Sequence, residues 1–226
     1  MLRPILVLSA GAAVLATSQV SAEPAGDYLS RALDADSSGP VYQYDLSYRS
    51  EDLSVSARID PSRPLGQRVQ VLSPSKSDWN KEITEGVEDL EADPVDDFWC
   101  SGFAEMVPRN ASLVGQTGTT ATYRFQPLPD PNDPDDAKLM KHLVGEITVA
   151  KQDPQILSIA LTAPQPFKPV WVAKITRFDL SVACERVPDG RTHVREFRIT
   201  VDGKAALQTL REREQRTITN VRLASN

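Results

Sequence analysis

Histidine, cysteine and glycine are scarce in this 226-residue chain, and their scarcity limits the chemistry that we expect of it. The two histidines, His142 and His193, lie far apart, and no Cys/His spacing resembles a zinc site. After the first 22 residues there is no G-x-S-x-G nucleophile turn, and the chain has no glycine-rich loop suited to phosphate. The sequence therefore predicts a protein that is not an enzyme and that uses no cofactor or metal.

Long hydrophobic runs are also missing, except for one near the amino terminus. That run follows Arg3 and precedes the small-residue sequence Val20-Ser21-Ala22, which is the layout of a cleavable secretory signal. The run is too short to be a permanent membrane anchor, and no cysteine follows the predicted cleavage site for lipid attachment. We expect a signal peptide at 1–22 and a periplasmic or secreted domain at 23–226.

Basic residues are fewer than acidic residues in this chain. Lys and Arg number 25 against 31 Asp and Glu, which gives a formal net charge of −6. This balance disfavours nucleic acids and anionic membranes as partners held by bulk electrostatic attraction. The chain also has no Gly/Ser-rich linker and no internal repeat, so we expect a single domain.

The two cysteines, Cys100 and Cys184, form an even pair in a chain predicted to enter an oxidising compartment. We therefore expect a disulfide, which would stabilise the fold by roughly 4–5 kcal/mol in the loop-entropy model. The alternative is a reactive Cys100 thiol, either alone or paired with His142. No basic cluster that would lower its pKa surrounds Cys100 in the sequence.

Alternation of apolar and polar residues dominates the chain and predicts a β-rich fold. Strands are expected at 42–48, 53–59, 67–72, 112–115, 119–125, 143–150, 156–163, 178–184, 197–202 and from 205 towards 223, the last with a break within 212–216. Tight turns are predicted at Pro188-Asp189-Gly190-Arg191 and at Asp202-Gly203. A short helix is expected at 27–35.

A helical insertion is predicted at about 77–107, between the third and fourth strands. One helix, capped by Ser77, would place four apolar residues on one face: Trp79, Ile83, Val87 and Leu90. A second helix, with Asp93 as its N-cap, would end before Pro108. The fold class is therefore mainly β with a few helices: a curled antiparallel sheet, or unclosed half-barrel, covered by the inserted helical pair.

Clusters of carboxylates have two interpretations. The loop 130–136 carries four aspartates and could hold calcium, but it lacks the glycine and distal glutamate of an EF-hand, so a solvated acidic loop is favoured. The pairs Asp96/Asp97 and Glu212/Glu214 could serve acid–base chemistry. In a chain with 31 acidic residues, surface charge is the favoured interpretation.

Aromatic residues gather on the elements that should face each other across the core. The candidate ligand-binding residues are Tyr42, Tyr44, Tyr48, Trp79, Trp99, Phe103 and Trp171. They would either fill an ordinary core or line a cavity for an apolar ligand, because aromatic side chains with polar tips suit a cavity mouth. Periodicity does not separate these two arrangements.

The layout of elements resembles the LolA-like family of periplasmic lipoprotein carriers and its RseB-type sensor relatives. The resemblance is carried by the signal peptide, the leading helix, the hairpin Tyr42–Ile59, the helices at 77–107 and the long meander that follows. It implies an unclosed barrel whose concave face holds acyl chains beneath a helical lid.

Two functions therefore stay open. The first is an exported, non-catalytic carrier or sensor that holds a lipid or lipoprotein in an apolar trough. The second is an interaction or scaffold module without a cavity, which binds an envelope protein through its surface.

Overall fold

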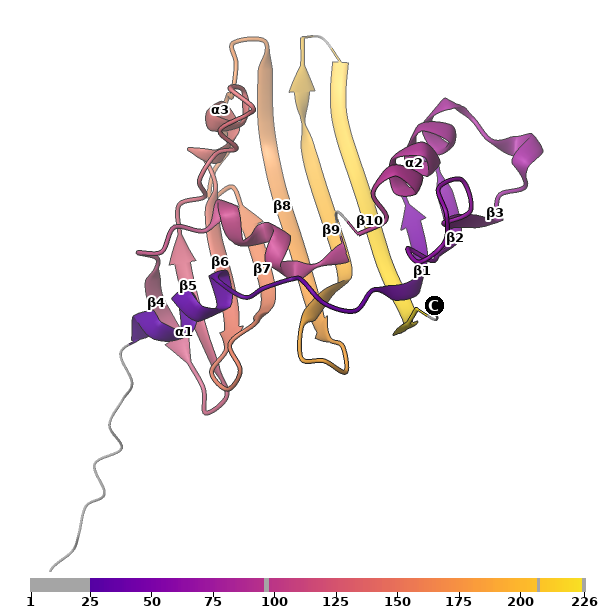
Figure 1. Ribbon diagram of the computed structural model, residues 1–226. Coiled ribbons are helices and arrows are strands. Elements are labelled where there is room, and N and C mark those ends of the chain that lie inside the picture. The colour runs from indigo at the N-terminus through magenta and orange to yellow at the C-terminus, as the bar shows by residue number, and fades with distance from the viewer. Residues whose placement is uncertain (1–24, 96–97, 207, 225–226) are drawn as a thin grey trace, which may run out of the picture.

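The computed structural model describes residues 25–95, 98–206 and 208–224. The predicted signal peptide and the Asp96/Asp97 pair lie outside these residues. The chain forms one sheet of ten antiparallel strands whose two edges do not meet (Figure 1), so the predicted fold class is confirmed. No helix among the described residues is long and apolar enough to cross a membrane.

The strands lie in the order β3-β2-β1-β10-β9-β8-β7-β6-β5-β4. Their bounds are β1 Tyr42–Arg49, β2 Ser54–Ile59, β3 Val69–Ser73, β4 Ser112–Gln116, β5 Thr120–Phe125, β6 Val144–Ala150, β7 Ile156–Thr162, β8 Ala173–Arg186, β9 Thr192–Ala205 and β10 Gln208–Leu223. The helical segments are α1 Ala25–Leu33, η1 Lys76–Asp78, α2 Lys81–Ala92, η3 Cys100–Met106 and α3 Asp136–Met140.

This order explains why the helical insertion crosses the sheet. Strands β3 and β4 are consecutive in the chain but form opposite edges of the sheet. The segment that joins them, with α2 and η3, must therefore cross the whole sheet, and Figure 1 shows it doing so on the concave side. The last strand, β10, pairs with β1. This pairing joins the meander β1–β3 to the meander β4–β10.

Directly opposite residues in paired strands share a face. One row on the concave face can be followed across nine strands through Val55, Tyr48, Arg216, Phe197, Val182, Ile159, Ile147, Tyr123 and Leu113. Every member of this row is apolar or aromatic except Arg216. The apolar surface of the concave face therefore extends across these nine strands, and Arg216 is the charged residue in this row.

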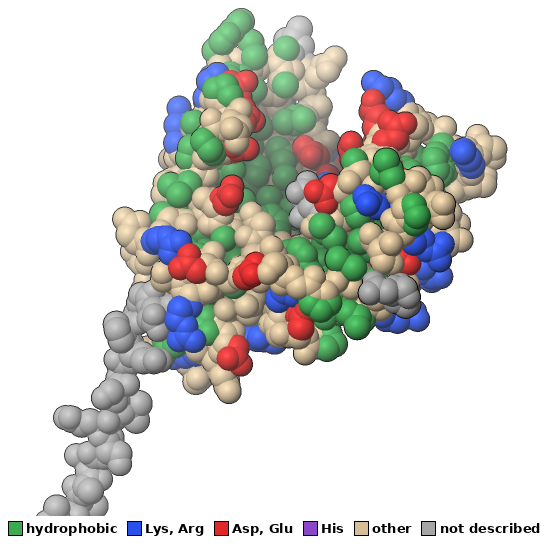
Figure 2. Space-filling model, in the orientation of Figure 1, with side chains coloured by type: hydrophobic (Ala, Val, Ile, Leu, Met, Phe, Trp, Pro, Cys, Tyr) green, Lys and Arg blue, Asp and Glu red, His purple; other side chains and the backbone are tan. Residues whose placement is uncertain are grey.

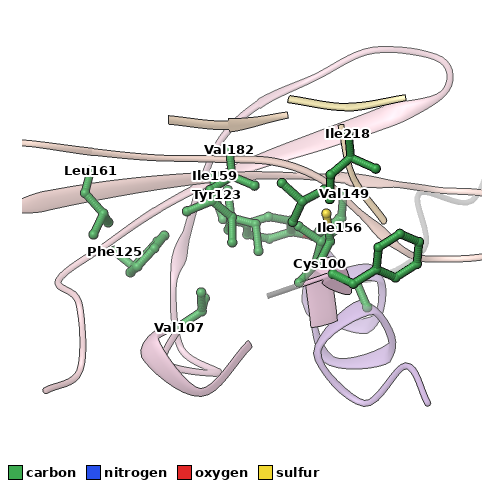
Figure 3. Packing of buried hydrophobic residues seen from close by; sticks show 14 of the residues in the cluster. Cys100, Val107, Tyr123, Phe125, Val149, Ile156, Ile159, Leu161, Val182 and Ile218 are labelled. Carbon is green, nitrogen blue, oxygen red and sulfur yellow. The ribbon is translucent and has the colours of Figure 1, made fainter. Parts of the chain in front are cut away.

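The part of the sheet from β4 to β8 has a dense core. Helix α1 contacts β5, β6 and η3, and η3 contacts β7 and β9. Figure 3 shows Tyr123, Ile159 and Val182 extending from the sheet towards the helical layer that carries Cys100 and Val107. All of these side chains are buried.

The Cys100–Cys184 disulfide joins η3 to β8, as the sequence predicted. It excludes the alternative of a reactive Cys100 thiol, because no cysteine in the described chain is free. The bond fixes the crossing segment to the middle of the sheet.

The inserted helices differ from their predicted form. Helix α2 begins after Asn80 rather than Ser77, because the Asn80 side chain accepts a hydrogen bond from the Ile83 N–H at 2.9 Å. The predicted second α-helix is wrong: the described part of it is a 3-10 helix, η3. Asp93 ends α2 instead of starting a new helix, with its N–H bonded to the Asp89 carbonyl.

The turn predicted at Asp202-Gly203 is also wrong. Both residues lie inside β9, which pairs Ala205 with Gln208 across the actual turn. A side chain at position 203 would collide with the backbone of Lys174, so the glycine allows β8 and β9 to approach closely beside an irregularity in their register. The break predicted within 212–216 is absent, since β10 is continuous.

Candidate functional site

A cavity of about 740 Å³ lies between α2 and the strands β1, β2, β3, β9 and β10. Leu46, Val55 and Val71 of the strands and Val87 and Leu90 of α2 are among its lining side chains. Figure 2 shows the molecule hollowed beside α2, with hydrophobic side chains inside the hollow and acidic ones at its edge. The volume lies within the range of about 300–1,000 Å³ that is typical of small-molecule sites.

Helix α2 stands over this space without filling it. Ile83, Val87 and Leu90 recur at the spacing of an amphipathic helix and point to the sheet. Gly86 lies on the same face, and a Cβ added there would meet no atom within 4 Å. Only Ile83 of α2 is buried, so the apolar face of the helix stands over the cavity without filling it.

The carboxyl end of α2 is fastened to the edge of the sheet. The Glu91 carboxylate accepts hydrogen bonds from the backbone N–H groups of Gly66, Arg68 and Val69. Burial alone would raise the pKa of Glu91, but these three donors outweigh it and lower the pKa below 4.5. The Arg68 guanidinium donates in return to the carbonyls of Glu91 and Ala92.

Tyr44 lines the cavity and holds the segment that follows α2. Its hydroxyl donates to the Pro94 carbonyl at 2.7 Å, and its ring stacks on Phe98 with centroids 4.8 Å apart. Phe98 also stacks on His193 of β9 at 5.3 Å. These contacts hold the segment after α2 against the sheet and define the boundary between the cavity and the dense core.

Arg216 of β10 places a positive charge among the side chains that line the cavity. Arg216 contacts Glu214 at 2.7 Å and lies over the Phe197 ring at 5.4 Å, while the side chain of Glu214 is only 16% exposed. Burial raises the pKa of Tyr48, and the negative charges of Glu214 and Glu82 raise it further. Glu82, Asp89 and Asp93 add acidic groups to the lining, so the charge around the cavity is predominantly negative.

The cavity brings together only some of the predicted ligand-binding residues. Tyr44, Tyr48 and Phe103 line it. Trp79 does not line it and instead lies near Lys76, whose ammonium group is 5.8 Å from its ring centroid. Trp171 is 90% exposed on the β7–β8 connection, outside the cavity.

Tyr42 and Trp99 serve a structural cluster around Arg191. The Arg191 guanidinium lies 3.9 Å from the Trp99 ring centroid and donates to the Asp189 carboxylate at 2.6 Å. The Tyr42 hydroxyl donates to the same carboxylate at 3.1 Å. Because further donors of Arg191 bond the carbonyls of Ser37 and Pro40, this cluster anchors the chain that enters β1.

Sequence reasoning missed the charged floor of the cavity. Glu214 was expected at the surface, and Arg216 was not singled out. The signal was present in the alternation of β10, where Leu210, Glu212, Glu214, Arg216 and Ile218 occupy one face. Only the pairing of Arg216 with Tyr48 and Phe197 identifies that face as the concave one.

Candidate metal ligands were sought in the part of the chain that the structure describes. It contains no group of three or more His, Cys, Asp or Glu side chains placed to hold a metal ion. In the acidic loop, Asp130 accepts from the backbone of Asn132, and Asp135 pairs with Lys138.

Comparisons with family models, with curated proteins and with solved structures found no match to this chain.

Proposed function

We propose that this protein is an exported, non-catalytic binding protein that holds an acyl chain, free or attached to a lipoprotein, in the cavity under α2. The observation that carries the proposal is the apolar cavity of about 740 Å³ in a sheet whose other part is densely filled. Burial of hydrocarbon would supply the affinity, at about 0.8 kcal/mol per methylene group.

The chemistry of the lining supports binding of an apolar ligand. Most of the lining side chains that the structure describes are apolar, and none is Ser, Cys or His. Arg216, held by its ion pair with Glu214, is a fixed polar group among apolar lining side chains, an arrangement that orients the polar end of an amphiphilic ligand.

The layout of the fold supports a role as a carrier or sensor of the LolA-like kind. The sheet is unclosed, and its concave face is crossed by the helical insertion. The disulfide suits an oxidising compartment such as the periplasm. The alternative of a scaffold module would be favoured by a filled interior, and an open cavity argues for the carrier.

The test is binding of cis-parinaric acid, a fluorescent fatty acid, followed by displacement with saturated fatty acids of increasing length. We expect saturable binding and an increase in affinity of about fourfold per added methylene until the cavity is full. The decisive variant is Gly86→Phe, whose ring would enter the empty space beside Gly86. We expect it to weaken binding at least tenfold.

The matched control is Glu88→Phe, which introduces the same side chain on the exposed face of α2. It should bind like the unmodified protein. Equal binding by Gly86→Phe and Glu88→Phe, or no saturable binding by the folded unmodified protein, would contradict the proposal. Circular dichroism and a melting curve establish that both variants are folded.

A further inference from the structure

The connection between β7 and β8 carries the most exposed large apolar side chain in the described part of the protein. Val170, Trp171 and Val172 are 39%, 90% and 40% exposed, and they follow one another at the tip of this connection. We call these three residues the tryptophan tip. An exposed cluster of this kind is informative because large aromatic side chains are normally buried to a large extent.

The tip is held in place by the strands beneath it. Phe167 is buried, and its N–H and carbonyl both bond Ile175 at 2.9 Å. The Val170 carbonyl accepts from the Ala173 N–H, and the Val172 carbonyl accepts from the Ala206 N–H at 2.7 Å. The fold therefore presents Trp171 to solvent as a fixed projection.

Three lysines flank the tip in an acidic protein. Lys168, Lys174 and Lys204 are exposed, and neither 164–176 nor 203–211 contains an acidic residue. Lys174 and Lys204 are direct partners in the β8–β9 ladder, so two like charges face each other. In the described chain, no carboxylate forms an ion pair with any of these three lysines. Such a repulsive pair is relieved by an external anionic surface.

The tip lies at the end of the molecule where β8 begins, beside the turn between β9 and β10 (Figure 1). Figure 2 shows hydrophobic side chains at this end. Helix α3 lies below this end in Figure 1, and His142, just after α3, stacks on Phe167 at the base of the connection. The positive region is therefore local to the tip, and the protein would approach a surface with this end first.

We propose that the tryptophan tip, with Lys168, Lys174 and Lys204, docks on an anionic lipid bilayer. Trp171 would enter the interfacial region, where amphipathic indole rings are favoured, and the lysines would remain among the anionic headgroups. Each lysine near such a surface strengthens binding about fivefold at moderate ionic strength. A single ring and three charges give shallow, reversible attachment rather than insertion.

A bilayer suits this projection better than a protein partner does. Stable protein interfaces bury about 800 Å² on each side, usually over a broad surface with matched hydrogen bonds. The tip is narrow and consists of three consecutive apolar residues. The three nearby lysines form no ion pair among the described residues and do not alternate with hydrogen-bonding groups that a protein partner would match. The inference goes beyond acyl-chain binding and does not depend on an occupied cavity.

The experiment is co-sedimentation of the full protein with vesicles of phosphatidylcholine containing 30% phosphatidylglycerol, at low salt. We expect binding to these vesicles, weaker binding to pure phosphatidylcholine, and a blue shift of tryptophan emission. Trp171→Ser should weaken binding at least tenfold, and the triple change of Lys168, Lys174 and Lys204 to Gln should abolish the preference for anionic lipid. Added salt should weaken the binding of the unmodified protein.

Leu65→Ser is the matched control, because Leu65 is 70% exposed on the β2–β3 connection, away from the tip. This variant should bind vesicles like the unmodified protein. Failure of the folded protein to bind anionic vesicles, or equal loss in Leu65→Ser and Trp171→Ser, would overturn the proposal. Binding only to vesicles that carry envelope proteins would also overturn it, in favour of a protein partner.

Discussion

Two regions of the same concave face pack in opposite ways. In the filled half, β4 to β8 under α1 and η3, side chains such as Ile147, Ile159 and Tyr123 are no more than 1% exposed. In the hollow half, β1 to β3 and β10 under α2, Leu46, Val55 and Val71 are only partly buried and line the cavity. The strands of both halves have similar apolar alternation, so the helical layer makes the difference.

The helical layer is attached differently on the two sides. In the filled half, η3 is joined to β8 by the disulfide and its apolar residues pack directly on the sheet. In the hollow half, α2 is tethered at its carboxyl end by Glu91 and Arg68, and Gly86 leaves a gap on its inner face. Under the proposed function, this division would preserve the core and leave room for a ligand.

The largest effect should come from breaking the covalent link of the filled half. The double variant Cys100→Ser with Cys184→Ser should lose about 4 kcal/mol of unfolding free energy, because the bond closes a long loop. Chemical denaturation measures this loss. Reductant should destabilise the unmodified protein by a similar amount and leave the double variant unchanged, and an equal response of both would contradict the structural role.

A matched pair of valine truncations compares the packing of the two halves. Val149→Ala in β6 should cost about 2–3 kcal/mol, because it opens a void in a close-packed core. Val55→Ala in β2 should cost less than about 1 kcal/mol, because its side chain already borders empty space. Equal losses in urea denaturation would show that the cavity is not open in solution.

Two glycine substitutions should change stability in opposite directions. In the filled half, Gly145→Ala would place a methyl group against the Phe125 ring, and we expect a loss of about 1–3 kcal/mol. In the hollow half, Gly86→Ala meets open space in a helix interior, and we expect a gain of about 0.5–1 kcal/mol. Melting temperatures of the two variants check this. A lower melting temperature in Gly86→Ala would contradict the presence of open space beside Gly86.

The mildest expected effect concerns pH at the boundary between the halves. Burial lowers the pKa of His193 below its ordinary value of 6.5, so the folded state keeps the ring neutral while the unfolded chain takes up a proton. Stability should therefore fall as the pH drops below about 6.5. Urea unfolding at pH 7.5 and 5.5 should show this loss in the unmodified protein and less of it in His193→Gln. Equal losses in the unmodified protein and in His193→Gln would contradict this assignment.

The strands were predictable from the sequence, because a period of two is a local signal. Their boundaries failed where a local signal was misleading, as at Asp202-Gly203, whose turn-like composition serves close strand contact instead. The candidate site was less predictable. Tyr44, Tyr48 and Phe103 were identified, whereas Arg216 and Glu214 were missed because their face depends on register with β1 and β9.

The sequence by itself determined a β-rich chain with a helical insertion and one cysteine pair, since alternation, helix signals and composition are encoded by neighbouring residues. Tertiary structure alone decided which half would be filled. That outcome depends on how closely each helical segment approaches the sheet, and this distance is set by contacts such as Glu91 with Val69 and Tyr44 with Pro94, between residues at least 22 positions apart.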